Sequence, residues 1–408
     1  MSVRSASVEL TTGRVRGRDG AYLGIPYAAP PVGGRRWAPP APVERWAGEL
    51  DALAPGPPPP QPVRPISEFA WGVIPPGDED CLYLNVWTPR SGHGPWPVLV
   101  FLIGGGFTVG WTGSGLDDGA ALAEAAQVVV VTFSYRLGSL GWAFGNWGLR
   151  DQLAVLEWVA REIGAFGGDP ARVTLGGQSA GAACVADLLG CPAADGLFSQ
   201  AMLHSPPLPE AAGDPERRAR WEHDLDVTPQ TPAAEVVARH EALLQVGEWQ
   251  GTRGAAQPTL EGDLLPTSPL DAPAARIDVP VLVGTTRDEA TFLFRTGGRD
   301  APDEQCERVT AHLFREPTER WARSRAQAGG RVHLFRIEHA SPDPRLGALH
   351  TIDVPLLFGT FATSEVARHY VDDDERTRAV SDLMQGEWGR FFHGEDLAWP
   401  ADTPRVIG

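Results

Sequence analysis

The chain has 408 residues, of which 42% are hydrophobic and 21% charged, a balance typical of soluble globular proteins. Its 52 acidic residues outweigh 35 basic ones, and the net charge of −17 argues against nucleic acid or an anionic membrane as partner and favours a neutral or apolar ligand. Large α/β folds commonly use this length as one unit, so we expect a single domain over residues 1–408.

The N-terminal segment and the cysteines bear on the cellular compartment. Residues 1–5 lead into a polar, strand-like segment without the long apolar stretch of a secretory signal, and no apolar run approaches the length of a membrane span. The cysteines match no metal-binding spacing and are interpreted as reduced, mostly buried thiols; they are Cys81, Cys184, Cys191 and Cys306. We therefore expect a cytoplasmic protein without a metal or membrane partner.

Apolar patterning predicts alternating strands and helices. Strands are predicted over residues 82–87, 97–103, 128–133, 173–175, 201–204, 279–284 and 332–337, and helices over 151–160, 233–248 and 373–392. Several of these strands are continuous apolar runs, as expected of strands buried on both faces of a mostly parallel sheet. The alternation predicts a doubly wound α/β domain with helices on both faces and with functional residues at the carboxyl ends of the strands.

A serine lies between a predicted strand and a small, apolar helical stretch. The pentapeptide Gly177-Gln178-Ser179-Ala180-Gly181 directly follows the strand at 173–175. Glycines on both sides permit a tight turn where side chains would collide with the neighbouring strand or helix. This arrangement is typical of the nucleophile elbow of an α/β-hydrolase, although the pentapeptide alone also fits an ordinary glycine-rich turn.

A nucleophilic serine needs a histidine base, and the base needs an orienting carboxylate. In α/β-hydrolases the acid and then the histidine follow the serine along the chain. Asp288 and Glu289 both follow the predicted strand at 279–284, and the residues alone do not choose between them. The candidate bases are His333, His339 and His350; His333 lies inside a predicted strand and is expected to be a packed residue, and His339 and His350 are close to equal. The plain alternative is a structural histidine and a solvated acidic turn.

A glycine triplet follows the predicted strand at 97–103. Gly104-Gly105-Gly106 could turn backbone N–H groups toward an oxyanion at close range, together with the N–H of Ala180. A flexible turn is the plain alternative. A phosphate cradle is disfavoured because the lysine of a P-loop is absent.

Several further motifs are spread over nearly the whole chain. They are Gly24-Ile25-Pro26-Tyr27-Ala28, Glu79-Asp80-Cys81-Leu82-Tyr83-Leu84-Asn85-Val86, Asn146-Trp147-Gly148-Leu149-Arg150-Asp151-Gln152, Phe166-Gly167-Gly168-Asp169-Pro170 and Gly176-Gly177-Gln178-Ser179-Ala180-Gly181-Ala182. Together they resemble the type B carboxylesterase and cholinesterase family. The resemblance implies an α/β-hydrolase fold with a mostly parallel sheet and no cofactor.

The resemblance also implies a role for each candidate residue. It makes Ser179 the nucleophile, Glu289 the acid and His350 the base, because the Asp-Glu-Gly and Gly-Ala-x-His motifs of the family fall on residues 288–290 and 347–350. The implied oxyanion donors are the amides of Gly105, Gly106 and Ala180. The hydroxyl of Ser205 is implied to help hold the carboxylate of Glu289.

This chain departs from the family pattern near the serine and in length. Gln178 stands where the family usually has Glu, from which we infer a weaker attraction for cationic substrates, and Ile103 replaces a usual His or aromatic residue. The segments between Ser179 and Glu289 and between Glu289 and His350 are shortened. We therefore expect a reduced cap region and an open cleft.

The expected function is hydrolysis of a neutral or apolar carboxylic ester through an acyl-enzyme, in an open cleft that could admit bulky esters. Trp111, Phe292 and Phe294 are predicted to line the substrate pocket, with plain core packing as the alternative. A transacylase or a carbamate or amide hydrolase would use the same triad. A cholinesterase-like binding protein would keep the fold without catalysis.

Overall fold

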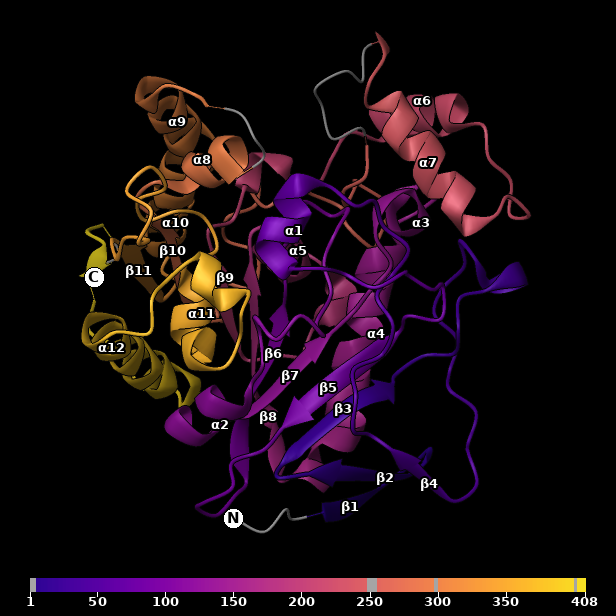
Figure 1. Ribbon diagram of the computed structural model, residues 1–408, viewed down its shortest axis with the longest axis horizontal. Helices are drawn as coiled ribbons and strands as arrows, with labels where there is room; N and C mark the ends of the chain where they lie inside the picture. Colours follow the sequence, from indigo (N-terminus) through magenta and orange to yellow (C-terminus); the bar gives the residue numbers. More distant parts are fainter. Residues whose placement is uncertain (1–4, 248–254, 297–299, 400–401) are drawn as a thin grey trace.

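The computed structural model describes residues 5–247, 255–296, 300–399 and 402–408 (Figure 1). The strands are β1 Ser5–Leu10, β2 Gly13–Arg18, β3 Ala21–Pro26, β4 Glu49–Asp51, β5 Tyr83–Trp87, β6 Trp96–Leu102, β7 Val129–Phe133, β8 Gly168–Gln178, β9 Gln200–His204, β10 Val281–Thr286, β11 Val332–Ile337 and β12 Arg405–Ile407. The α-helices are α1 Pro65–Trp71, α2 Ala120–Ala126, α3 Gly138–Trp142, α4 Trp147–Glu162, α5 Ala180–Leu189, α6 Pro215–Leu225, α7 Ala233–Leu243, α8 Glu289–Thr291, α9 Asp303–Val309, α10 Glu316–Gln327, α11 Asp353–Phe358 and α12 Glu375–Phe392.

All the strands join one 12-stranded sheet. Their order is β1-β2-β3-β5-β7-β6-β8-β9-β10-β11-β12, with β4 paired to β2. The pairs from β1 to β7 along this order are antiparallel, and those from β7 through β6 to β12 are parallel. This is the α/β architecture with a mixed, mostly parallel sheet that the sequence predicts.

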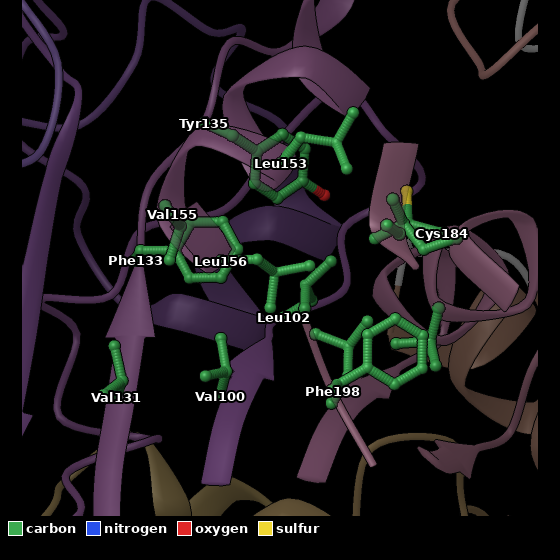
Figure 2. Close-up of a cluster of buried hydrophobic side chains, with 14 of the residues drawn as sticks. Val100, Leu102, Val131, Phe133, Tyr135, Leu153, Val155, Leu156, Cys184 and Phe198 are labelled. Atoms are coloured by element: carbon green, nitrogen blue, oxygen red, sulfur yellow. The ribbon is translucent and has the colours of Figure 1, made fainter. Parts of the chain in front are cut away.

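Alternate residues of the central strands face two separate cores. On β6, Val98, Val100 and Leu102 belong to one core, which also contains side chains of α4, α5 and α10, and Leu99 and Phe101 belong to the other, which contains side chains of α2, α11 and α12. Figure 2 shows part of the first core, where side chains of β6, β7, α4 and α5 meet. Both faces exclude water, which explains why the strands read as continuous apolar runs.

The predicted strands all lie within observed ones, or overlap them to within about two residues at an end. The strand predicted at 173–175 is the central part of the much longer β8. Strands β2, β3, β4 and β12 were not predicted, because they are short and none of them contains a continuous apolar run. Helix α7 ends at Leu243, and residue 248 of the helix predicted over 233–248 lies outside the described residues.

Helices α1, α6, α7 and α8 lie at one end of the molecule, far from β1 and β2 (Figure 1). The loops that follow β6, β8 and β10 carry the glycine triplet, Ser179 and Glu289. Within the described residues, no helix is both long and apolar enough to span a lipid bilayer. The sheet therefore presents its candidate groups at the carboxyl ends of parallel strands, beneath α1.

Candidate active site

Ser179 occupies a strained turn between β8 and α5. Its backbone has φ 55° and ψ −125°, a conformation that is rare for a residue with a side chain. A Cβ atom on Gly177 would lie 2.6 Å from the carbonyl group of Gly181, and one on Gly181 would lie 2.2 Å from the carbonyl oxygen of Leu102. Both glycines are therefore required by close packing, and the N–H of Ser179 donates to the carbonyl of His204 at 2.9 Å.

A buried carboxylate orients the imidazole of His350. Oε2 of Glu289 lies 2.5 Å from Nδ1 of His350, and Oε1 of Glu289 accepts a 2.7 Å hydrogen bond from the backbone N–H of Thr286. Glu289 is fully buried. Because an ionised carboxylate only accepts hydrogen bonds, Nδ1 carries the proton and Nε2 presents its lone pair.

Asp288, the other acid in this turn, contacts the backbone that leads to His350. Its Oδ2 accepts from the N–H of Ala348 at 2.8 Å, and its own N–H donates to the carbonyl of Ala348 at 2.9 Å. Gly347 has φ +60°, and a Cβ there would lie 2.2 Å from Oδ2 of Asp288. Asp288 thus holds the histidine loop, while Glu289 is the acid that contacts the histidine ring.

The alternative histidines lie in other surroundings. Nε2 of His339 is 3.1 Å from Oγ1 of Thr377, and the ring of His333 packs against Phe391 and Trp399. Among the described histidines, only His350 is hydrogen-bonded to a carboxylate on the turn that follows β10.

The glycine triplet forms a tight turn beside the serine. The carbonyl of Gly105 accepts from the N–H groups of Thr108 and Val109, each at 3.1 Å, and Gly105 has φ +126°. A Cβ on Gly104 would lie 2.7 Å from Cβ of Ser179, so glycine is required for this approach. Gly105 and Gly106 line the same cavity as Ser179 and His350. Ala180 begins α5, where backbone N–H groups lack helical partners.

This cavity has a volume of about 140 Å³. Its apolar side chains are Ile66 and Trp71 of α1, Val109, Leu244, Phe292 and Leu293, and its polar ones include Arg64, Thr108, Gln178 and Thr351. Such a lining offers apolar surface around the serine and very little charge. The guanidinium of Arg64 is paired with Glu241 of α7 through Nε at 3.0 Å and through Nη2.

The aromatic residues predicted for the pocket are placed differently from one another. Phe292 lines the cavity, whereas Trp111 and Phe294 do not. Nε1 of Trp111 donates to the carbonyl of Gly56 at 3.0 Å, and Phe294 packs near Cys306. The sequence analysis did not predict three of the lining residues, Ile66, Trp71 and Leu244. They lie far from Ser179 in sequence and belong to no recognisable motif.

The shortened chain does not leave the serine openly exposed. Ser179 is 9% exposed. Helix α1 contributes Ile66 and Trp71 to the cavity, and the Arg64–Glu241 ion pair ties the start of α1 to α7. The open cleft expected from the sequence stays a prediction, and the cavity beside Ser179 is lined mostly by apolar side chains.

The contact expected between Ser205 and Glu289 is not among the hydrogen bonds of the described residues. The Glu289 carboxylate instead bonds to Thr286 and His350.

A buried histidine–carboxylate pair, which the sequence analysis did not identify, lies at the end of β9. Nδ1 of His204 is 2.5 Å from Oδ2 of Asp353, and Nε1 of Trp388 donates to Nε2 of His204 at 2.8 Å. This contact anchors the segment after His350 to β9.

Gln178 contacts the reactive face of His350. Its Nε2 lies 3.1 Å from Nε2 of His350 and 3.1 Å from Oγ1 of Thr351. The hydrogen bonds made by the described residues include none between Oγ of Ser179 and His350.

Among the described residues, no group of three or more His, Cys, Asp and Glu side chains is placed to hold a metal ion. All the cysteines are buried free thiols. Burial raises the pKa of the Cys81 and Cys184 thiols well above the usual range of a cysteine. Neither thiol therefore forms the nucleophilic thiolate readily.

Comparisons with known proteins extend over almost the whole chain. The sequence profile of the carboxylesterase family matches residues 4–310. A phenmedipham hydrolase from Pseudarthrobacter oxydans is 33% identical over 460 aligned positions, covering 95% of this chain and 91% of the relative. Para-nitrobenzyl esterase from Bacillus subtilis (strain 168) is 32% identical over 435 positions, covering 93% and 88%. A solved structure of a PNB esterase superposes with a TM-score of 0.87 at 31% identity, covering 97% of this chain and 93% of its own.

Proposed function

Because this chain belongs to the carboxylesterase family, we propose that it is a serine carboxylic-ester hydrolase that acts through an acyl-enzyme on small neutral or apolar esters. One observation carries this proposal. The oriented pair of Glu289 and His350, the strained Ser179 and the glycine turn all meet at one cavity.

The reaction begins with attack of the Ser179 hydroxyl on the ester carbonyl. His350 takes the hydroxyl proton at Nε2, and Glu289 stabilises the resulting imidazolium through Nδ1. The N–H groups of Gly105, Gly106 and Ala180 bind the oxyanion. The alcohol then leaves with the proton from His350, and water repeats the sequence on the acyl-enzyme to release the acid.

The lining of the cavity supports the choice of substrate. Phe292, Leu244 and Trp71 offer apolar contact, and the positive charge of Arg64 is already neutralised by Glu241. An ester without charge loses no hydration of an ionic group on entering such a site. The acidic surface of the chain likewise disfavours polyanionic substrates.

A fluorophosphonate probe and a panel of p-nitrophenyl esters test the proposal. The probe should label Ser179, and Ser179→Ala should lose both labelling and hydrolysis, by on the order of 10⁶ in kcat. Gly386→Ala, on the exposed face of α12 with nothing near the added methyl group, is the control for handling and folding. Wild-type rates in Ser179→Ala would refute the assignment.

A second candidate is transfer to another acceptor or hydrolysis of a carbamate or amide. It uses the same acyl- or carbamoyl-enzyme, and the similarity to a phenmedipham hydrolase favours including it. Parallel assays of matched ester, carbamate and amide substrates, with and without added alcohol, separate these reactions. A non-catalytic binding protein would leave the probe unreacted.

A further inference from the structure

Gln178 is the residue of this cavity whose contact bears most directly on the candidate base. It is the last residue of β8, and its side chain is almost wholly buried, with 1% of the residue exposed. Within the sheet, Gln178 is paired with His204 of β9. Its amide nitrogen lies 3.1 Å from Nε2 of His350, the atom that must accept the serine proton.

The direction of this hydrogen bond follows from the rest of the network. Glu289 binds Nδ1 of His350, and its other oxygen is held by the N–H of Thr286, so the proton of the neutral ring lies on Nδ1. Nε2 of His350 is then an acceptor, and the Gln178 amide must present N–H to it. The second amide hydrogen is directed to Oγ1 of Thr351 at 3.1 Å.

We propose that Gln178 is a positioning residue that stabilises the neutral form of His350 in the free enzyme and so extends catalysis to lower pH. This inference rests on the proposed function, because it takes His350 as the base. A donor on Nε2 favours the neutral ring. In an imidazolium, Nε2 bears a proton, so its N–H group would point at the N–H group of the amide and no hydrogen bond could form.

The contact also has a consequence during the reaction. When the proton of Ser179 moves to Nε2 of His350, the Gln178 amide loses that acceptor but keeps Oγ1 of Thr351. A glutamate at position 178 would do the opposite, because its carboxylate accepts from the imidazolium. The neutral side chain at this position thus stabilises the imidazolium less than a carboxylate would. In return, His350 of the free enzyme stays unprotonated to lower pH.

The pH profile of kcat/KM tests the proposal, because it reports the titration of the free enzyme. In Gln178→Met, which keeps the volume and removes the donor, the midpoint of the acid limb should rise by about half a pH unit to one unit. In Gln178→Glu the midpoint should rise by about one to two units. Gln152→Met is the matched control, since Gln152 is buried to the same 1% on α4, and its midpoint should not move.

Each outcome bears on the proposal. A merely structural role for Gln178 would lower kcat or the melting temperature in Gln178→Met without moving the midpoint, and that result would overturn the inference. A shift in Gln178→Glu alone would also overturn it, because it would reflect only the new charge. Failure of the wild-type protein to hydrolyse any ester would instead refute the proposed function. If Gln178→Met does not fold, Gln178→Leu, which also removes the donor without adding charge, makes the same comparison with the wild type in a ¹⁵N-histidine NMR titration, with His350 assigned from His350→Gln.

Discussion

Glu289→Gln is expected to place the proton of His350 on the wrong nitrogen. The backbone N–H of Thr286 donates to Oε1 at 2.7 Å, so the glutamine oxygen must occupy that place. Its NH₂ group then faces Nδ1 of His350, where the Oε2 atom of Glu289 now lies at 2.5 Å. The ring must accept at Nδ1, so its proton moves to Nε2, which can no longer take a proton from Ser179.

The size of this effect follows from losing the base and the charge that stabilises the imidazolium. A wrong tautomer in a serine triad lowers kcat by about 10⁴-fold, or about 5.5 kcal/mol in activation free energy. The substitution is nearly isosteric, so the melting temperature should change little. The measurement is kcat for a p-nitrophenyl ester, with Glu44→Gln at an exposed position as the matched control.

The reasoning would be refuted if purified, folded Glu289→Gln kept more than about a tenth of the wild-type kcat while Ser179→Ala was inactive. That result would mean that Glu289 does not set the tautomer. A comparable loss in Asp288→Asn with none in Glu289→Gln would transfer the role to the neighbouring acid.

Other predictions concern the oxyanion turn, the cavity and a buried acid. Gly105→Ala would place Cβ 1.7 Å from the carbonyl oxygen of Val109 at φ +126°, so kcat should fall on the order of 10²–10³-fold with a small change in KM, and unchanged kcat would contradict its role. Phe292→Ala should lower kcat/KM for long-chain acyl or alkyl esters on the order of tenfold, whereas Phe294→Ala, outside the cavity, should not; equal effects would reject the assignment. Burial raises the pKa of Asp117 to about 7, so the folded state holds a proton that the unfolded state releases, and stability falls as pH rises from about 4 to 7. Asp117→Asn should therefore gain about 3 kcal/mol relative to wild type between pH 5 and pH 8 in urea unfolding, and an equal difference at both pH values would contradict this.

Much of the candidate site could be predicted because its signals are local. The elbow at Ser179 needs small neighbours and a strand before it, and the glycine turn needs backbone freedom. Both features therefore require particular residue types at adjacent positions, which can be recognised in the sequence. Continuous apolar runs likewise identify strands that are covered on both faces. The choice of Glu289 over Asp288 came only from the family resemblance, because both acids sit in the same turn and differ only in what they reach in space.

The sequence by itself determined the class of fold and the glycine positions, since each depends on neighbours along the chain, and it predicts the order of nucleophile, acid and base. Only the tertiary structure decided what surrounds them. Three features join segments far apart in sequence: the place of Ile66 and Trp71 in the cavity lining, the Arg64–Glu241 ion pair, and the hydrogen bond from Gln178 to His350. Such contacts depend on how the strands and helices pack, and no periodicity or motif in the chain encodes them directly.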